Sequence, residues 1–208
     1  VAELTGVEPA VIPYGVDMAP CGDPADARQG ERAGVEVLTV GRLIERKGHL
    51  VLLEAMARLR ERRRDVALTI VGEGHERPRI EARVRELGLS DCVRLAGRVS
   101  DAELRAAYAG CDMFVLPAIV DSAGDTEGLG MVLLEAMRYQ RPCIASRLGG
   151  ITDIVADGET GLLVPPADPP ALAAAIERLA DDAALARTLG EAGRRINAAR
   201  FAWDGVVE

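Results

Sequence analysis

The chain has 208 residues, of which 49% are apolar and 28% are charged, so it can bury a substantial core and wholesale disorder is excluded. Aromatic residues make up only 3% of the chain and the formal net charge is −8. This combination excludes a base-stacking platform and bulk-charge binding of duplex DNA, and we expect no nucleic-acid partner. The sequence contains no apolar run of bilayer-spanning length and no export signal pattern at its start.

Strand-like and helical segments alternate along the chain. Short apolar or β-branched runs predict strands at 36–41, 66–72, 92–97, 112–117, 142–146 and 161–164. Helical spacing predicts helices at 48–64, 76–87, 100–110, 129–140 and 150–156, with Ala-rich helices over 168–202. Ser100 followed by Glu103 forms a capping-box signature. This alternation is typical of a parallel sheet covered on both faces, which is an α/β, Rossmann-like, doubly wound domain of about six strands.

The cysteines do not form a pattern that indicates redox or metal chemistry. Cys21, Cys92, Cys111 and Cys143 include no CxxC pair, and their density is far below that of a disulfide scaffold. The last three lie in or beside strand-like runs. We therefore expect small buried hydrophobic side chains in a cytoplasmic protein, and no metal site.

The loop after the first strand, GRLIERKG at 41–48, carries two cations. Arg42 and Lys47 stand at the carboxyl end of a strand, which is where open α/β sheets bind their ligands. Two ordinary solvated charges near a helix start would give the same sequence pattern as an anion site. The pair alone therefore leaves both interpretations open.

The loop after the fourth strand leads into a glycine-rich helix start, DTEGLGMVLLEAM at 125–137. At Gly128 and Gly130 the backbone N–H groups can approach an anion closely, aided by the helix dipole. Glu127 and Glu135 lie about 12 Å apart along a helix axis, too far for one acid/base dyad. Contacts to the two ends of an elongated ligand with an anionic middle fit better, and a nucleoside diphosphate-sugar has that shape.

The remaining motifs argue against several other classes of protein. Gly72 and Gly74 in VGEG are interpreted as turn residues, and no third glycine completes a dinucleotide fingerprint. His49 and His75 have no partner at metal-ligand spacing. A GxxxxGK[ST] segment is also missing from the sequence, so a nicotinamide-dependent dehydrogenase is disfavoured and a P-loop NTPase is excluded.

Seven short motifs, which follow one another along the chain, together carry a resemblance to a known family. Together they resemble glycosyltransferase family four, whose members are retaining, nucleotide-sugar-dependent enzymes of the two-domain GT-B fold. The strings are VIPYGVD (11–17), VGRLIERKGH (40–49), IVGEG (70–74), EGLGMVLLEAM (127–137), PCIAS (142–146), GGITDIV (149–155) and DGETGLLVPPAD (157–168). Each motif alone is weak evidence for the family, but their occurrence in the family's order is specific. The resemblance covers about residues 10 to 190.

The resemblance implies roles for individual positions. Arg42 and Lys47 match the family's diphosphate-binding cations and Glu127 matches the glutamate on the donor sugar, so these three are the expected catalytic residues. Glu135 matches the glutamate on the ribose hydroxyls, and Val99 matches a position whose main chain meets the base. The other expected donor-binding residues are Gly41, Gly128, Leu129, Gly130 and Met131.

The chain departs from the family pattern at a few positions. Asp153 stands where glutamate is common and Arg141 stands where glycine is usual, while the loop at 117–126 is longer and more acidic than in many members. These departures affect the identity of the sugar and of the acceptor more than the class of enzyme.

The resemblance also implies an organisation of domains. Residues 1–20 would be the remnant of an interdomain hinge, and 21–190 the nucleotide-sugar-binding domain, which is the C-terminal half of a GT-B fold. Residues 191–208, with Phe201 and Trp203, would pack on a missing N-terminal domain that supplies the acceptor site. Any peripheral membrane contact would also belong to that domain.

The expected activity is retaining, metal-independent transfer of a sugar from a UDP- or GDP-sugar to an unknown acceptor. No cofactor is expected, and the isolated chain is expected to be inactive because half of the cleft is absent. The alternative is a non-catalytic nucleotide or nucleotide-sugar-binding regulatory module.

Overall fold

The computed structural model describes residues 34–63 and 65–201, so the expected hinge at 1–20, Cys21 and Trp203 lie outside the described residues. Its strands form one parallel sheet in the order β3-β2-β1-β4-β5-β6. The strands are β1 (Val35–Val40), β2 (Val66–Val71), β3 (Val93–Gly97), β4 (Met113–Leu116), β5 (Cys143–Ser146) and β6 (Gly161–Val164). The predicted Rossmann-like doubly wound sheet is confirmed.

Helices connect successive strands, as predicted, with boundaries within one or two residues of expectation. They are α2 (His49–Arg62), α3 (Arg77–Glu86), α4 (Asp101–Gly110), α5 (Met131–Arg138), α6 (Ile151–Ile154), α7 (Pro169–Asp181) and α8 (Ala183–Phe201), with a short 3₁₀ turn η2 (Glu45–Lys47). The predicted capping box is present at the start of α4: Ser100 Oγ accepts from the Glu103 amide and Glu103 accepts from the Ser100 amide. None of the described helices is long and apolar enough to cross a membrane.

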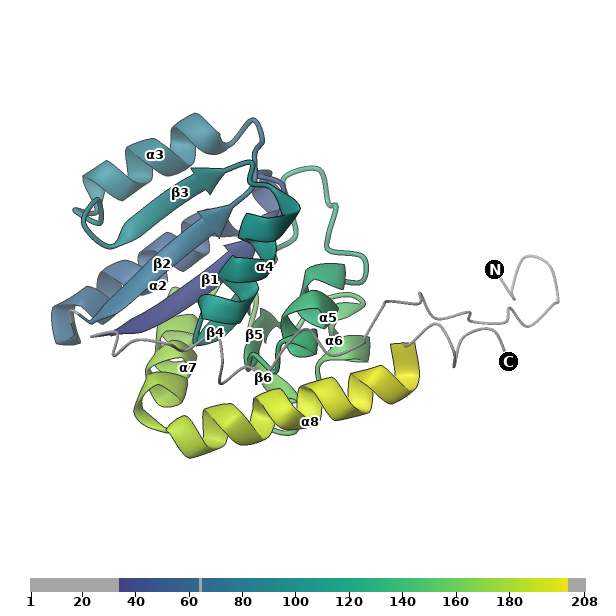
Figure 1. Cartoon of the computed structure of the whole chain (residues 1–208). Coiled ribbons are helices and arrows are strands. Elements are labelled where there is room, and N and C mark those ends of the chain that lie inside the picture. Colours follow the sequence, from purple (N-terminus) through teal and green to yellow (C-terminus); the bar gives the residue numbers. More distant parts are fainter. Residues whose placement is uncertain (1–33, 64, 202–208) are drawn as a thin grey trace, which may run out of the picture.

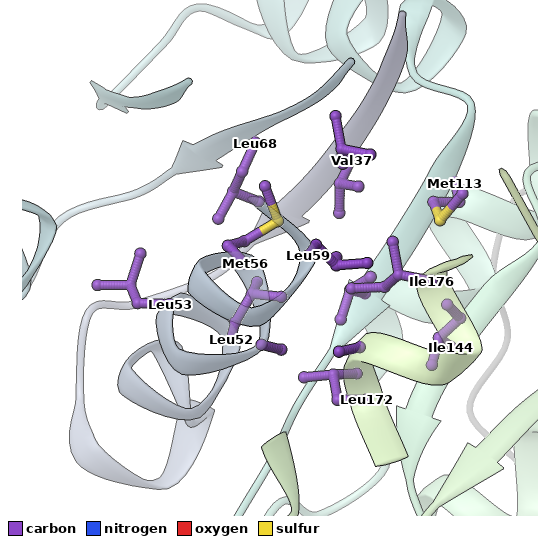
Figure 2. Packing of buried hydrophobic residues seen from close by; sticks show 14 of the residues in the cluster. Val37, Leu52, Leu53, Met56, Leu59, Leu68, Met113, Ile144, Leu172 and Ile176 are labelled. Atoms are coloured by element: carbon purple, nitrogen blue, oxygen red, sulfur yellow. The ribbon is translucent and has the colours of Figure 1, made fainter. Parts of the chain in front are cut away.

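Alternate residues of the strands contribute to two separate cores, one on each face of the sheet. Figure 1 shows helices on both sides of the sheet. In β1, Val37 belongs to the first core and Leu38 to the second. Figure 2 shows the first core, where Met56 and Leu59 of α2 and Ile176 of α7 pack together against the sheet. The second core lies between the sheet and helices α4, α5 and α6. Two-sided burial explains why the strands are mostly apolar on both faces and do not alternate regularly with polar residues.

The last helix, α8, connects the two cores. Leu189 near its start belongs to the first core, and Phe201 at its end is 3% exposed and belongs to the second. The Phe201 ring is therefore packed within the second core of this domain. The expectation that residues 191–208 pack on another domain stays a prediction. Figure 1 shows α8 running along one edge of the domain.

The strand order reverses between β1 and β4. The chain leaves the carboxyl ends of these two neighbouring strands toward opposite sides of the sheet. Such a reversal is where doubly wound sheets bind ligands. Gly48 allows the two loops to meet: it has φ +68° and initiates α2, and a Cβ there would lie 1.8 Å from the carbonyl oxygen of Pro117. The amide of Ile119 also donates to the carbonyl of Arg46 (2.9 Å).

We expect Gly48→Ala to lower the free energy of unfolding by about 3 kcal/mol, since it combines a left-handed backbone with a steric clash. Gly88→Ala is the matched control, because Gly88 has φ +65° but a Cβ on it would meet no heavy atom within 4 Å. That control should lose only about 1 kcal/mol. Urea denaturation of both variants checks this, and equal losses would contradict the steric argument.

Candidate functional site

The loop after β1 is fixed by the loop after β2. Leu43 is fully buried, its amide donates to the carbonyl of Glu73 (2.9 Å), and its own carbonyl accepts from the amide of Glu76 (3.0 Å). Gly74 permits this contact, because a Cβ there would lie 2.2 Å from the Leu43 oxygen. The backbone on either side of Leu43 is thereby fixed, and with it the placement of Arg42 and the 3₁₀ turn that ends at Lys47.

The two predicted cations have different environments. Arg42 is exposed, and its guanidinium makes no hydrogen bond or ion pair within residues 34–63 and 65–201. Lys47 folds back over Gly41, where a Cβ would lie 3.5 Å from Lys47 Cε, and its side chain is only 13% exposed. The structure therefore leaves one cation open to solvent and places the other within the loop contact.

Lys47 forms an ion pair with Glu127, with 2.5 Å between Nζ and Oε2, and both side chains are 13% exposed. The Glu127 Oε2 atom is buried and accepts no hydrogen bond of good geometry, so the contact is an electrostatic pairing rather than a directed hydrogen bond. It joins the loops after β1 and β4 at the point where the sheet order reverses. Two of the three residues predicted to be catalytic are thus brought together.

The loop between β4 and α5 rests on the 3₁₀ turn. Ser122 donates to Glu45 Oε2 through its amide (3.1 Å) and its hydroxyl (2.6 Å), and these bonds lower the pKa of Glu45. Asp121 Oδ1 accepts from the amides of Ala123 and Asp125 (3.0 and 2.9 Å) and so closes a turn. The carboxylates of Glu45 and Asp121 therefore serve local backbone structure. The described residues contain no group of three or more His, Cys, Asp or Glu arranged to hold a metal.

The glycine-rich segment before α5 is supported by the loop after β5. The amide of Gly150 donates to the carbonyl of Gly128 (2.9 Å), and a Cβ on Gly150 would lie 2.1 Å from that oxygen. Gly149 makes a similar approach to the carbonyl of Glu127 (2.5 Å from a Cβ). Gly130 has φ +77° and begins α5 without a side-chain cap. These contacts fix the backbone that carries Glu127 and leave the start of α5 uncapped.

Gly128 itself has no internal reason to be glycine. Its φ is not positive, the residue is exposed, and a Cβ on it would meet no heavy atom within 4 Å. A side chain there would extend into open space beside the start of α5 and the Lys47–Glu127 pair. Glycine at such a position fits the close approach of a ligand to the backbone. Leu129 is half-buried and Met131 is the first residue of the helix.

Glu135 lies one turn into α5 and has a specific partner. Tyr108 on α4 donates its hydroxyl to Glu135 Oε2 (2.7 Å). Glu127 and Glu135 therefore contact different groups, Lys47 and Tyr108. Their expected contacts to the two ends of an elongated ligand stay a prediction.

Val99 follows β3 and lines a groove of about 370 Å³ between α4 and strands β1 to β3. The groove also contains the polar group of Glu36, Thr69 and Arg94, in which the Thr69 hydroxyl donates to Glu36 Oε1 (2.6 Å). Arg42, Lys47 and Glu127 do not line it. Val99, the expected base-contact position, therefore borders this groove next to α4. The groove is separate from the cations at the sheet reversal.

The described histidines and cysteines include three buried groups, His49, Cys111 and Cys143. His49 is buried at the start of α2, where desolvation and the nearby Lys47 charge lower its pKa to about 4, so it is neutral at neutral pH. Cys111 and Cys143 are buried free thiols, as expected, whereas Cys92 is only partly buried and departs from that expectation. Burial raises the pKa of Cys111 to about 12. None of these three groups is a charged or nucleophilic component of the site at neutral pH.

Two kinds of residue that support the candidate site were not predicted from the sequence. Gly149 and Gly150 were recognised only as part of a string, and their role as the support of Glu127 and Gly128 depends on contacts between separate loops. Tyr108 was not singled out. The available signal was its spacing of four residues from Leu104, which places a polar-tipped aromatic side chain on the inner face of an amphipathic helix.

Comparison with known proteins agrees with this geometry. The family described as "Glycosyl transferases group 1" matches residues 28–196, so the chain belongs to that family. A GDP-mannose-dependent alpha-(1-6)-phosphatidylinositol monomannoside mannosyltransferase of Mycolicibacterium smegmatis is 37% identical over 200 residues, which are 92% of this chain and 52% of that protein. The chain spans about half the length of the curated relatives it matches.

Solved glycosyltransferase structures share the fold. Sucrose-phosphate synthase of Thermosynechococcus elongatus superposes with a TM-score of 0.83 at 37% identity, covering 95% of this chain and 49% of that one. Anabaena Alr3699/HepE, in complex with UDP and glucose, superposes with a TM-score of 0.81 at 25% identity, covering 95% of this chain and 54% of that one. The Rossmann-like half of a GT-B glycosyltransferase is the fold that was predicted, and it is confirmed.

The ion pair makes a prediction about anion binding. Glu127→Gln removes the charge that competes for Lys47, so the affinity for inorganic pyrophosphate should rise about two- to fivefold. Calorimetric titration measures this.

Asp125→Asn is the control for charge alone, since it removes a carboxylate from the same loop whose side chain is 71% exposed. Its affinity should change by less than about 1.5-fold because solvent screens that charge. An equal gain in both variants, or a gain that persists when Lys47→Met is added to Glu127→Gln, would contradict the competition.

Proposed function

We propose that the chain is the donor-binding domain of a retaining, metal-independent glycosyltransferase that transfers a sugar from a nucleoside diphosphate-sugar. The observation that carries the proposal is the meeting of Lys47 and Glu127, 2.5 Å apart, beside the uncapped start of α5 at the sheet reversal. A diphosphate needs a cation and free backbone donors, and a sugar needs a carboxylate for its hydroxyls. Both requirements are met within one loop contact.

The proposed chemistry is the cleavage of the bond between an anomeric carbon and a phosphate oxygen. Negative charge grows on the departing oxygen, and Arg42, Lys47 and the N-terminal end of α5 are the groups that would stabilise it as a preorganised site. The anomeric carbon becomes cation-like, while Glu127 holds the sugar hydroxyls so that the acceptor attacks from the face the diphosphate leaves. The product keeps the anomeric configuration of the donor.

The nucleoside end of the donor would be bound by residues on α5 and after β3. Glu135 would accept from the ribose hydroxyls, and the main chain at Val99 would contact the base. The mannosyltransferase relative is named as GDP-mannose-dependent and the Anabaena structure contains UDP, so the likenesses support a nucleotide-sugar and leave a UDP- or GDP-sugar as the proposed donor. The buried thiols fit a reducing compartment, and a cytoplasmic location belongs to the proposal.

The test is a set of parallel calorimetric titrations of the chain with UDP, GDP and ADP, with and without magnesium. We expect one diphosphate to bind without metal, and Glu135→Ala to lose at least about tenfold in affinity because a charged hydrogen-bond partner of the ribose is removed. No binding at millimolar ligand by a folded chain would contradict a donor site that functions within these residues. Binding only with magnesium would contradict metal independence.

A second prediction concerns catalysis in a protein that joins this chain to an acceptor-binding domain. Lys47→Ala should lower kcat by about 100-fold or more while donor affinity falls much less, because the charge that Lys47 meets is largest in the transition state. Steady-state kinetics with varied donor separates the two effects. Unchanged kcat with a raised KM would contradict the catalytic role, and donor binding without any transfer by the unaltered protein would identify a non-catalytic module.

A further inference from the structure

The hydroxyl of Tyr108 is the partner that the structure gives to Glu135. Its distance to Oε2 is 2.7 Å, while the other carboxylate oxygen, Oε1, is not among the buried unsatisfied atoms of the described residues. A carboxylate has about four lone-pair directions. One hydrogen bond from a phenol therefore fixes the orientation of the group and leaves acceptor capacity for further donors.

The Tyr108 ring is held rigidly between other aromatic side chains. It stacks on Tyr139 with 5.6 Å between centroids and packs against Phe114 at 5.8 Å in a tilted arrangement. Only 2% of the residue is exposed. The position of its hydroxyl is therefore set by the second core and does not depend on solvent.

The backbone of α4 at this point is fixed as well. The buried guanidinium of Arg141 donates to the carbonyl of Tyr108 from Nε (3.0 Å) and to the carbonyl of Ala109 (2.7 Å). A cation at the C-terminal end of a helix satisfies exposed carbonyls and opposes the helix dipole. Arg141, one of the departures from the family pattern noted in the sequence, thus anchors the helix turn that carries Tyr108.

The phenol remains a donor across the working pH range. Burial raises the pKa of Tyr108 well above its usual value, and the charge of Glu135 adds to that shift. Glu135 therefore always faces a protonated hydroxyl.

We propose that Tyr108 is a positioning residue that holds the Glu135 carboxylate in the orientation that accepts the two vicinal hydroxyls of the donor's ribose. The inference rests on the proposed function, since it concerns the same site. A diol offers two donors at fixed spacing, and a carboxylate that is already oriented loses less side-chain entropy when it accepts both. Tyr108 does not touch the ligand in this proposal and acts only through Glu135.

A merely structural hydroxyl would have a different signature. If the bond served only to join α4 to α5, its loss would weaken the domain and reduce the binding of every nucleotide alike. A positioning hydroxyl affects only ligands that carry the diol. The ratio of affinities for a ribose nucleotide and its 2′,3′-dideoxy counterpart separates the two roles.

The experiment titrates the chain with the diphosphate that it binds among UDP, GDP and ADP, and with the 2′,3′-dideoxy form of that nucleotide. Tyr108→Phe keeps the ring and removes the hydroxyl. We expect about a three- to tenfold loss of affinity for the ribose form and a change below about twofold for the dideoxy form. In the Glu135→Ala background, Tyr108→Phe should cause no further loss.

Phe114→Leu is the structural control, because it disturbs the same aromatic contact without removing a hydroxyl. It should lower the thermal midpoint and leave the ratio of the two affinities unchanged. Equal losses for both nucleotides in Tyr108→Phe, unaltered ribose binding, or losses that add to those of Glu135→Ala would each overturn the inference. Absence of binding by the unaltered chain is a different result: it contradicts the proposed function, and this inference falls with it.

Discussion

The functional edge of the domain depends on how closely two backbone segments approach each other. Gly48 lies against the carbonyl of Pro117 at a distance that no side chain tolerates, and this contact brings the loop after β1 to the loop after β4. Lys47 directly precedes Gly48, so its ammonium group reaches Glu127 across the same junction. The glycine therefore determines the placement of charge as well as the path of the chain.

The charges at this edge are arranged so that a cation can stay partly buried when no anion is present. The Lys47 side chain is only 13% exposed, so its ammonium group is partly desolvated, and Glu127 compensates for that loss. Arg42 needs no such compensation because it is exposed. In the proposed function, this charge-neutral pair and the exposed Arg42 would bind the anion together, and an anion that contacts Lys47 would replace the Glu127 carboxylate.

Local patterns in the sequence were sufficient for the fold. Mostly apolar strands, the capping box at Ser100 and helical spacing all act over a few residues, and each is found in the structure. The loops of the site were also recognisable, because the glycines and charges around Glu127 lie in one short stretch. What could not be predicted were contacts between distant segments: the bond between Tyr108 and Glu135, the support from Gly150, and the burial of Phe201. These depend on how loops and helices meet in three dimensions, which no local period encodes.

Helix α8 has a consequence for how the domain unfolds. Its start packs in the core on one face of the sheet and its end packs in the core on the other. Two hydrophobic cores separated by a sheet could in principle loosen independently, as separate cooperative units. A single helix anchored in both links their opening free energies, so disorder that begins beneath α2 is transmitted to the core that supports Glu135. Nucleotide bound on one side would then protect amides on the opposite face from exchange with solvent.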